Sequence, residues 1–183
     1  MMKKYTGFTA ILFAILAFSF SNVNAQSFSG SGSARTIEQN VNRQILRMPR
    51  YEVFDFIAFS VDGGTVTLYG KVRNAINRSE AENRVEDIPG VTSVINEIEV
   101  LPLGSFDDSI RRNLYGTLSS GGLSRYLWTT NPSVRLVVDR GHVTLEGFVA
   151  NKGDYNRMNI LAHGVSGVFS VKNNLVVDHG RAR

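Results

Sequence analysis

Apolar and polar positions along the first half of the chain follow a helical period and then a strand period. The helical stretch carries apolar residues at Ile37, Val41, Ile45 and Met48. This spacing predicts a helix from Thr36, whose hydroxyl can cap it, to the residue before Pro49. Alternation over 54–59 and 66–72 then predicts the two strands of a hairpin, because Asp62-Gly63-Gly64 between them is typical of a tight turn.

A second helix and a third strand complete this unit. Residues 74–88 place a few apolar side chains among many charged ones, a pattern typical of an exposed helix, and Pro89-Gly90 ends it. Residues 91–100 alternate again and predict the last strand, before a linker over 101–104. The predicted order of elements is therefore α-β-β-α-β.

The same pattern occurs a second time in the second half of the chain. Gly70 and Gly90 return as Gly147 and Gly167, both displaced by 77 positions (147 − 70 and 167 − 90), so no insertion separates the copies between them. Repetition at a fixed distance indicates a duplicated domain.

The second copy differs from the first ahead of its hairpin. Asp107 or Asp108 is the predicted cap of its first helix, which we expect to break at Ser119-Ser120-Gly121-Gly122. Asp139-Arg140-Gly141 is its predicted hairpin turn. The connection from helix to hairpin is longer than in the first copy, and it carries Tyr126-Leu127-Trp128.

These elements predict an α+β fold of two tandem units. The first unit spans 36–102, the second 103–178, and 179–183 form a short tail. Each unit is expected to be a three-stranded sheet covered on one face by two helices. Because a unit of about 70 residues has a small core, the two units are expected to pack on each other. The other face of each sheet could be solvated, could pair the units or could bind a partner.

The N-terminus has the layout of a secretory signal peptide over residues 1–25. Two lysines precede an apolar run at 8–20, and Val23-Asn24-Ala25 forms a small-residue cleavage site. The apolar run is shorter than the roughly 20 residues that a membrane-spanning helix needs, which favours export over a retained anchor. The Ser/Gly-rich stretch 26–35 is then expected to be a flexible leader.

Charge and cysteine content exclude several classes of protein. The formal charge of +4 falls to about +2 when the two lysines of the signal are removed, so electrostatics give no strong case for nucleic acid. The chain has no cysteine, which excludes disulfides, thiolate metal sites and a lipid-modified N-terminal cysteine.

The paired motifs resemble a known domain family. The first copy reads Gly63-Gly64-Thr65-Val66-Thr67-Leu68-Tyr69-Gly70-Lys71-Val72 and then Gly90-Val91-Thr92-Ser93-Val94-Ile95-Asn96. The second copy follows with Val143-Thr144-Leu145-Glu146-Gly147 and Gly167-Val168-Phe169-Ser170-Val171-Lys172-Asn173. Both look like the BON domain of bacterial envelope and osmotic-stress proteins. A signal peptide before two such domains is similar to periplasmic, osmotically inducible BON proteins, although the missing cysteine departs from members that are lipoproteins.

The recurring glycines have a structural explanation. Gly70 and Gly147 lie near the end of the second hairpin strand, where a residue without Cβ allows a bend or a close backbone contact. Gly90 and Gly167 follow the second helix, where a left-handed cap favours glycine. We therefore interpret the motif as a feature of folding and not as an active site.

Catalytic and metal-binding patterns are not found in the sequence. His142, His163 and His179 belong to three separate predicted elements and lack metal-ligand spacing. Asp62-Gly63-Gly64 and Asp139-Arg140-Gly141 have too few acidic positions for calcium loops and are explained as turns. With no nucleophile elbow or phosphate loop either, the sequence predicts a protein that is not an enzyme and needs no cofactor.

The resemblance implies contact with phospholipid, and the second copy offers residues for it. The candidate lipid-binding set combines cations with interfacial aromatics: Arg111, Arg112, Arg125, Tyr126, Leu127, Trp128, Lys152 and Arg157. Each basic residue near anionic lipid contributes roughly 1 kcal/mol, provided that these residues lie on the same side. An alternative remains at Trp128, which aligns with Tyr51 and so indicates a repeated core or domain-packing position.

Two functions follow as hypotheses. The first is a non-enzymatic, exported protein, periplasmic and either soluble or peripherally membrane-associated, that binds anionic phospholipid surfaces and supports envelope integrity or osmotic-stress tolerance. The second is a soluble chaperone-like or scaffold protein that engages envelope proteins through an open sheet face or a free strand edge. The position of the basic and apolar surface distinguishes them, because a lipid binder should gather both on one helix or loop.

Overall fold

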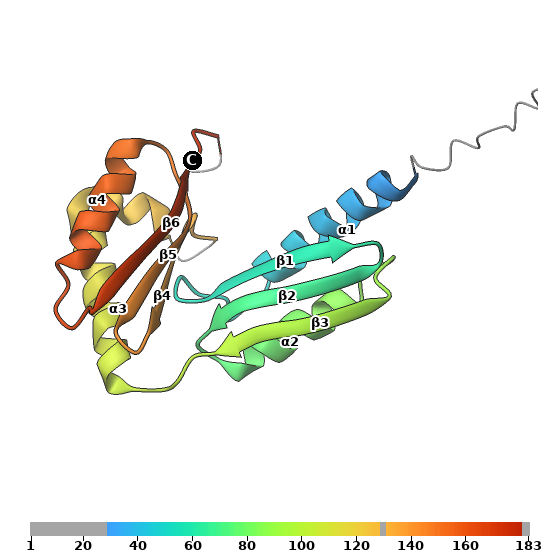
Figure 1. Cartoon of the computed structure of the whole chain (residues 1–183), viewed down its shortest axis with the longest axis horizontal. Coiled ribbons are helices and arrows are strands. Elements are labelled where there is room, and N and C mark those ends of the chain that lie inside the picture. Colours follow the sequence, from blue (N-terminus) through green and yellow to red (C-terminus); the bar gives the residue numbers. More distant parts are fainter. Residues whose placement is uncertain (1–28, 129–130, 181–183) are drawn as a thin grey trace, which may run out of the picture.

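The computed structural model describes residues 29–128 and 131–180, so the predicted signal peptide at 1–25 lies outside it (Figure 1). The first unit consists of α1 (Ser29–Leu46), β1 (Phe56–Asp62), β2 (Thr65–Val72), α2 (Ala75–Glu86) and β3 (Ser93–Val100). The second consists of α3 (Ser105–Leu118), η1 (Ser119–Leu123), η2 (Ser124–Tyr126), β4 (Val134–Asp139), β5 (His142–Val149), α4 (Lys152–His163) and β6 (Ser170–Val177). This order confirms the predicted fold class.

Each unit forms a three-stranded mixed sheet. The order is β1-β2-β3 in one sheet and β4-β5-β6 in the other. The hairpin strands pair antiparallel, whereas β2 and β5 pair parallel with β3 and β6, because a helix crosses over between them. In Figure 1, α3 and α4 lie together on one side of the second sheet.

The helices and sheets enclose two apolar cores. Val66, Leu68 and Val72 of β2 are fully buried against α1 and α2, as the alternation in the sequence predicts. Leu145 of β5 is buried in the same way in the second core. Val53, which belongs to the first unit, is part of the second core, so the two cores meet at the loop before β1.

The hairpins depend on glycine at two aligned positions. Gly70 lies opposite Ile57 and has φ +129°, and Gly147 lies opposite Val134 and has φ +114°. A Cβ at either glycine would collide with a backbone carbonyl, that of Phe56 or that of Ser133. The structure thus shows the close backbone contact that the sequence predicted.

Gly90 and Gly167 have positive φ angles of +95° and +89°, but they do not cap the helices. The C-caps are Asp87 and Gly164, and both have right-handed backbone angles. The prediction of a left-handed helix cap is therefore wrong. The two glycines lie three residues later, in the turn that leads to the last strand.

The starts of two helices also differ from the prediction. α1 begins at Ser29 and not at Thr36, so part of the expected flexible leader is helical, since each residue added to a helix that has already formed gains a backbone hydrogen bond. Gly104 caps α3 without a side-chain hydrogen bond. Asp107 instead accepts the backbone N–H of Arg140 at 2.8 Å and of Gly141 at 2.9 Å, and so holds the hairpin turn.

The two units contact each other along β4. Leu136 donates its backbone N–H to the carbonyl of Val53 at 2.8 Å, and the guanidinium of Arg135 lies 4.0 Å above the Tyr51 ring. Lys71 of the first unit pairs with Asp139 of the second at 2.6 Å. The first unit therefore covers the outward face of β4, which is why residues 134–138 are all buried.

Candidate functional site

Three of the eight predicted lipid-binding side chains are buried. The Arg111 guanidinium is 4% exposed, donates to the carbonyl of Val138 at 2.6 Å and pairs with Asp108 at 2.8 Å. Tyr126 and Leu127 are fully buried in the second core. The structure removes these three from the candidate surface, because their side chains are committed to packing and internal hydrogen bonds.

Tyr126 anchors the loop that leads to β4. Its hydroxyl donates to Asp154 at 2.6 Å and accepts the backbone N–H of Ala150 at 3.1 Å. Arg125 also pairs with Asp154, and its guanidinium lies 4.7 Å above the Tyr126 ring. Burial acts to raise the pKa of Asp154, but the hydrogen bonds from Tyr126 and Arg125 outweigh it and hold that pKa below its usual range. Arg125 therefore neutralises an internal carboxylate and contributes little free charge.

Trp128 is 68% exposed, so the alternative prediction of a core or domain-packing position is wrong. The aligned Tyr51 lies under Arg135, and its hydroxyl accepts the backbone N–H of Ile57 at 3.0 Å. The difference arises from the longer connection. Ile37 lies next to Gly90 and Ile110 lies next to Gly167, so the first helices of the two units are offset by 73 positions (110 − 37). The hairpins are offset by 77, and the second unit therefore has four more residues (77 − 73) between its first helix and Trp128 than the first unit has before Tyr51.

The remaining predicted residues, Arg112, Lys152 and Arg157, are exposed on the neighbouring helices α3 and α4. The exposed positions of α3 are Ser105, Phe106, Arg112, Asn113 and Gly116. Those of α4 are Lys152, Gly153, Asn156, Arg157, Ile160 and His163. None of the exposed residues of these two fully described helices is acidic. We call Arg112, Lys152, Arg157 and the 69% exposed Ile160 the basic helix face.

The carboxylates of α3 and α4 all have partners in the chain itself, although the Asp108 side chain is 37% exposed. Asp107 is buried at the hairpin turn, Asp108 pairs with Arg111 and with Arg73 of the first unit, and Asp154 pairs with Arg125. The exterior of this helix layer is consequently positive. The helices of the first unit differ, because they expose acidic side chains at Glu38 and Glu86 beside their cations.

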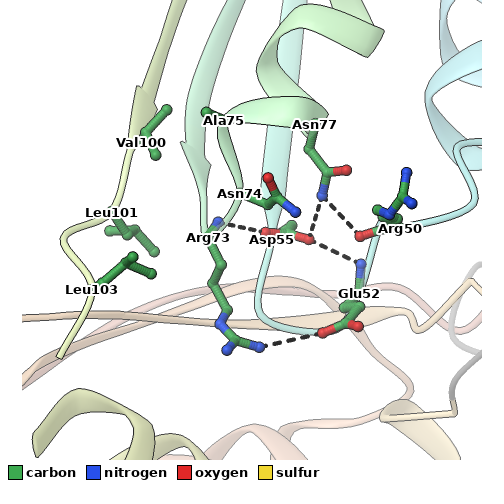
Figure 2. A pocket seen from close by; sticks show the side chains of 10 residues that line it. All are labelled: Arg50, Glu52, Asp55, Arg73, Asn74, Ala75, Asn77, Val100, Leu101 and Leu103. Carbon is green, nitrogen blue, oxygen red and sulfur yellow. Dashed lines mark hydrogen bonds and ion pairs between the residues drawn. The ribbon is translucent and has the colours of Figure 1, made fainter. Parts of the chain in front are cut away.

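A cavity of about 650 Å³ lies in the first unit beside the buried Asp55 (Figure 2). The Asp55 carboxylate accepts the backbone N–H of Arg73 at 2.7 Å, that of Glu52 at 3.0 Å and the side-chain amide of Asn77 at 2.9 Å. Burial raises the pKa of Asp55. Three donors from the chain itself occupy the carboxylate, so Asp55 anchors the loop before β1, and Glu52 in the same lining pairs with Arg73.

A second cavity of about 550 Å³ lies where the two units meet. It is lined by Val53 and Phe54 of the first unit and by Tyr115 and Leu127 of the second, with Glu52 and Arg112 beside them. Its lining is mainly apolar. Within the part of the chain that the structure describes, no group of three or more His, Cys, Asp or Glu side chains is placed to hold a metal ion.

A sequence model of the BON domain matches the chain twice, at residues 33–102 and 107–179. The chain belongs to the BON domain family. The two matches correspond to the first and second units, which we now call the first and second BON units.

Two solved structures are similar to this chain, both of CdsD, a structural protein of the type III secretion system of Chlamydia trachomatis. One has 15% sequence identity and a TM-score of 0.32, and the match covers 78% of this chain and 92% of that one. The other, the C-terminal domain, has 16% identity and a TM-score of 0.33, with 76% and 96% covered. No curated protein matches the chain.

Sequence reasoning missed two exposed apolar residues of the second BON unit. Phe106 is 49% exposed at the start of α3, and Phe169 is 70% exposed just before β6. A signal for Phe169 was available, because the first copy has Thr92 at the aligned position (169 − 77). An aromatic in one copy and a small polar residue in the other indicates a position whose side chain the fold does not fix.

Proposed function

We propose that this is an exported, non-enzymatic envelope protein whose second BON unit binds anionic phospholipid surfaces through the basic helix face. Membership of the BON family supports a role in the envelope, and the signal-like residues 1–25 support export. The proposed contribution to the cell is envelope integrity or osmotic-stress tolerance.

The observation that carries this proposal is the charge of α3 and α4. Arg112, Lys152 and Arg157 are exposed, whereas Asp108 of α3, whose side chain is 37% exposed, is paired with Arg73 and Arg111. At roughly 1 kcal/mol for each basic residue near an anionic surface, the three together contribute on the order of 3 kcal/mol, or about a hundredfold in affinity. Binding through such contacts should weaken as salt rises. Among residues 29–128 and 131–180, no helix is both long enough and apolar enough to cross a bilayer.

A second candidate function is binding of other envelope polypeptides. It is favoured by β6, an edge strand of the second sheet that exposes Val176 and Val177. An extended segment of a partner could add to such an edge through backbone hydrogen bonds.

The test is co-sedimentation of the chain from Gln26 to Arg183, which contains every residue that the structure describes. Vesicles of phosphatidylcholine alone are compared with vesicles that also contain phosphatidylglycerol, at low and at physiological salt. We expect binding to the anionic vesicles only, and weaker binding at the higher salt.

A matched pair of variants locates the binding surface. Arg112→Gln, Lys152→Gln and Arg157→Gln together should weaken binding on the order of a hundredfold. The control carries Arg43→Gln, Arg47→Gln and Arg78→Gln, which remove the same charge from exposed positions of the first unit, and it should bind like the wild type. Equal losses in both variants would contradict a specific surface. If the wild type binds no vesicle, the polypeptide alternative is tested by suppression of the aggregation of an unfolded client.

A further inference from the structure

Three exposed apolar side chains gather at one end of the second BON unit. Leu103 of the linker is 91% exposed, Phe106 of α3 is 49% exposed and Phe169 is 70% exposed. The Phe106 and Phe169 rings lie 5.8 Å apart between centroids, and Leu103 lines the same shallow cavity of about 350 Å³ as both of them. We call these three residues the apolar tip.

The fold does not require an aromatic side chain at this end. In the second unit Phe169 lies over Gly141 of the hairpin turn, where a Cβ would be 2.6 Å from the Phe169 ring. In the first unit Thr92 occupies the same place over Gly64, where a Cβ would be 2.7 Å from the Thr92 hydroxyl. A threonine therefore covers the turn equally well, and most of the Phe169 ring extends beyond what the packing needs. Exposed apolar groups of this kind mark interaction surfaces when they cluster.

The charges around the apolar tip match an anionic surface. Arg140 lines the same cavity, and its side chain is 77% exposed although it lies 3.8 Å from the Asp139 carboxylate. The carboxylate nearest to it in that cavity, Asp107, is buried and accepts two backbone N–H groups. Phe106 lies in the first turn of α3, six positions before Arg112 of the basic helix face.

We propose that the apolar tip inserts into the interfacial region of an anionic phospholipid bilayer while Arg112 and Arg157 of the basic helix face, each about 9 Å along its helix from this end, contact the headgroups. Apolar and aromatic side chains that project beside cations are typical of segments that lie at the boundary of headgroups and acyl chains. This inference rests on the proposed function. It adds which part of the molecule enters the membrane and how the unit is oriented, with the N-terminal end of α3 at the membrane and its C-terminal end farther from it.

The first test removes the apolar groups and leaves the charge unchanged. Phe169→Thr, which installs the residue of the first copy, is combined with Leu103→Ser. At physiological salt this variant should bind vesicles of phosphatidylglycerol and phosphatidylcholine at least about tenfold more weakly than the wild type. Its dependence on salt should stay that of the wild type, because no cation is lost. The control, Ile76→Ser with Ile95→Thr, removes two apolar side chains of the first unit that are 50% and 47% exposed, and it should bind normally.

The second test reports insertion directly. Trp128 is the single tryptophan of the chain, so Trp128→Phe with Phe169→Trp moves the fluorophore to the tip. On binding, fluorescence from position 169 should shift to the blue and be quenched by lipids with brominated acyl chains. The control places the fluorophore on the first unit, with Trp128→Phe and Ile76→Trp, and it should not be quenched.

Failure of this inference differs from failure of the proposed function. If the wild type binds anionic vesicles, the tip variant binds equally well and position 169 is not quenched, insertion is overturned while the proposed function stands. If the wild type binds no anionic vesicle, the proposed function fails and insertion fails with it. Loss of binding in the tip variant together with quenching at position 169 supports both.

Discussion

The two BON units anchor the loop before their hairpins with different chemistry. In the first unit, the Asp55 carboxylate takes the backbone N–H of Arg73 and the side-chain amide of Asn77. In the second, the aligned groups are the N–H of Ala150 and the Asp154 carboxylate, and the hydroxyl of Tyr126 meets both. The partner at position 77 is a donor in one copy, and the partner at 154 is an acceptor in the other. The side chain that holds this loop is therefore a hydrogen-bond acceptor in one unit and both a donor and an acceptor in the other, while the backbone N–H that it binds lies at the aligned position in both.

The two units differ more strongly on their surfaces than in their cores. The first presents helices of mixed charge and Thr92 at its hairpin end, whereas the second presents the basic helix face and Phe169. Both keep the close glycine contacts of the hairpin. Duplication thus left the packing of the scaffold intact and changed which side chains face outward, which is where a binding function would reside.

The largest effect should come from the feature that the two units share. Gly70→Ala and Gly147→Ala each place a Cβ against a carbonyl at a positive φ, and each should lower the free energy of unfolding by about 3 kcal/mol or more, measured by urea titration. Gly116→Ala is the control, because it lies in α3 with no atom near the added Cβ, and it should stabilise by about 0.5 to 1 kcal/mol. A wild-type unfolding curve for Gly147→Ala would show that the second hairpin tolerates a side chain there.

A smaller and unequal effect is expected at the two anchors. Asp55→Ala removes the acceptor of the backbone N–H groups of Glu52 and Arg73 and of one hydrogen bond of the Asn77 amide, and it should lower the free energy of unfolding by about 3 kcal/mol. Tyr126→Phe removes one hydroxyl with three hydrogen bonds, one of them from the exposed Arg125, and should lower the free energy of unfolding by about 1 to 2 kcal/mol. Ser79→Ala, on an exposed turn of α2, should change it by less than about 0.5 kcal/mol. Equal losses at Asp55 and Tyr126 would mean that the two anchors are energetically the same.

The smallest effect concerns the ion pair between the units. The hydrogen bond from Lys71 lowers the pKa of Asp139, so the folded value lies below that of the unfolded chain. The stabilisation from the Lys71–Asp139 pair is fully present above the pKa that Asp139 has in the unfolded chain, and it is lost as the pH falls through the lower pKa that Asp139 has in the folded chain. Asp139→Asn should therefore lower the free energy of unfolding by about 0.5 to 1 kcal/mol at pH 7, and the difference from wild type should vanish near pH 2. The control, Asp62→Asn, changes the aligned exposed residue of the first unit and should leave the free energy unchanged at both pH values. A difference that persists at pH 2 would assign the effect of Asp139→Asn to packing.

The hairpins and the repeat could be predicted because their signals are local. Asp62-Gly63-Gly64 is followed by β2 at Thr65, and the alternation of Val66, Leu68 and Val72 fixes the buried face. Asp107 was misassigned because the hydrogen bonds that it makes reach residues more than 30 positions away. A prediction from neighbouring positions assigns an aspartate to the cap of the nearest helix. The hydrogen bonds that Asp107 makes to the hairpin turn are visible only in the folded chain.

The candidate surface was predictable in part. The structure exposes the side chains of Arg112, Lys152 and Arg157, as the prediction requires. Charged side chains are seldom fully buried unless they are paired, so their exposure on a helix is predictable from the sequence. Tyr126, predicted for the surface, is buried, whereas Trp128, for which a core position was the alternative, is exposed, since four extra residues in the connection shift which aromatic side chain reaches the interior. That exchange depends on the path of a loop, which periodicity does not describe.

The burial of β4 on both faces has a consequence for the second unit. In an isolated copy of the second unit, the outward side of Val137 and the backbone that meets Val53 would be uncovered, and an apolar edge strand of this kind invites pairing with other molecules. The first unit thus shields its neighbour from self-association. Loss of the leading copy would therefore uncover this strand.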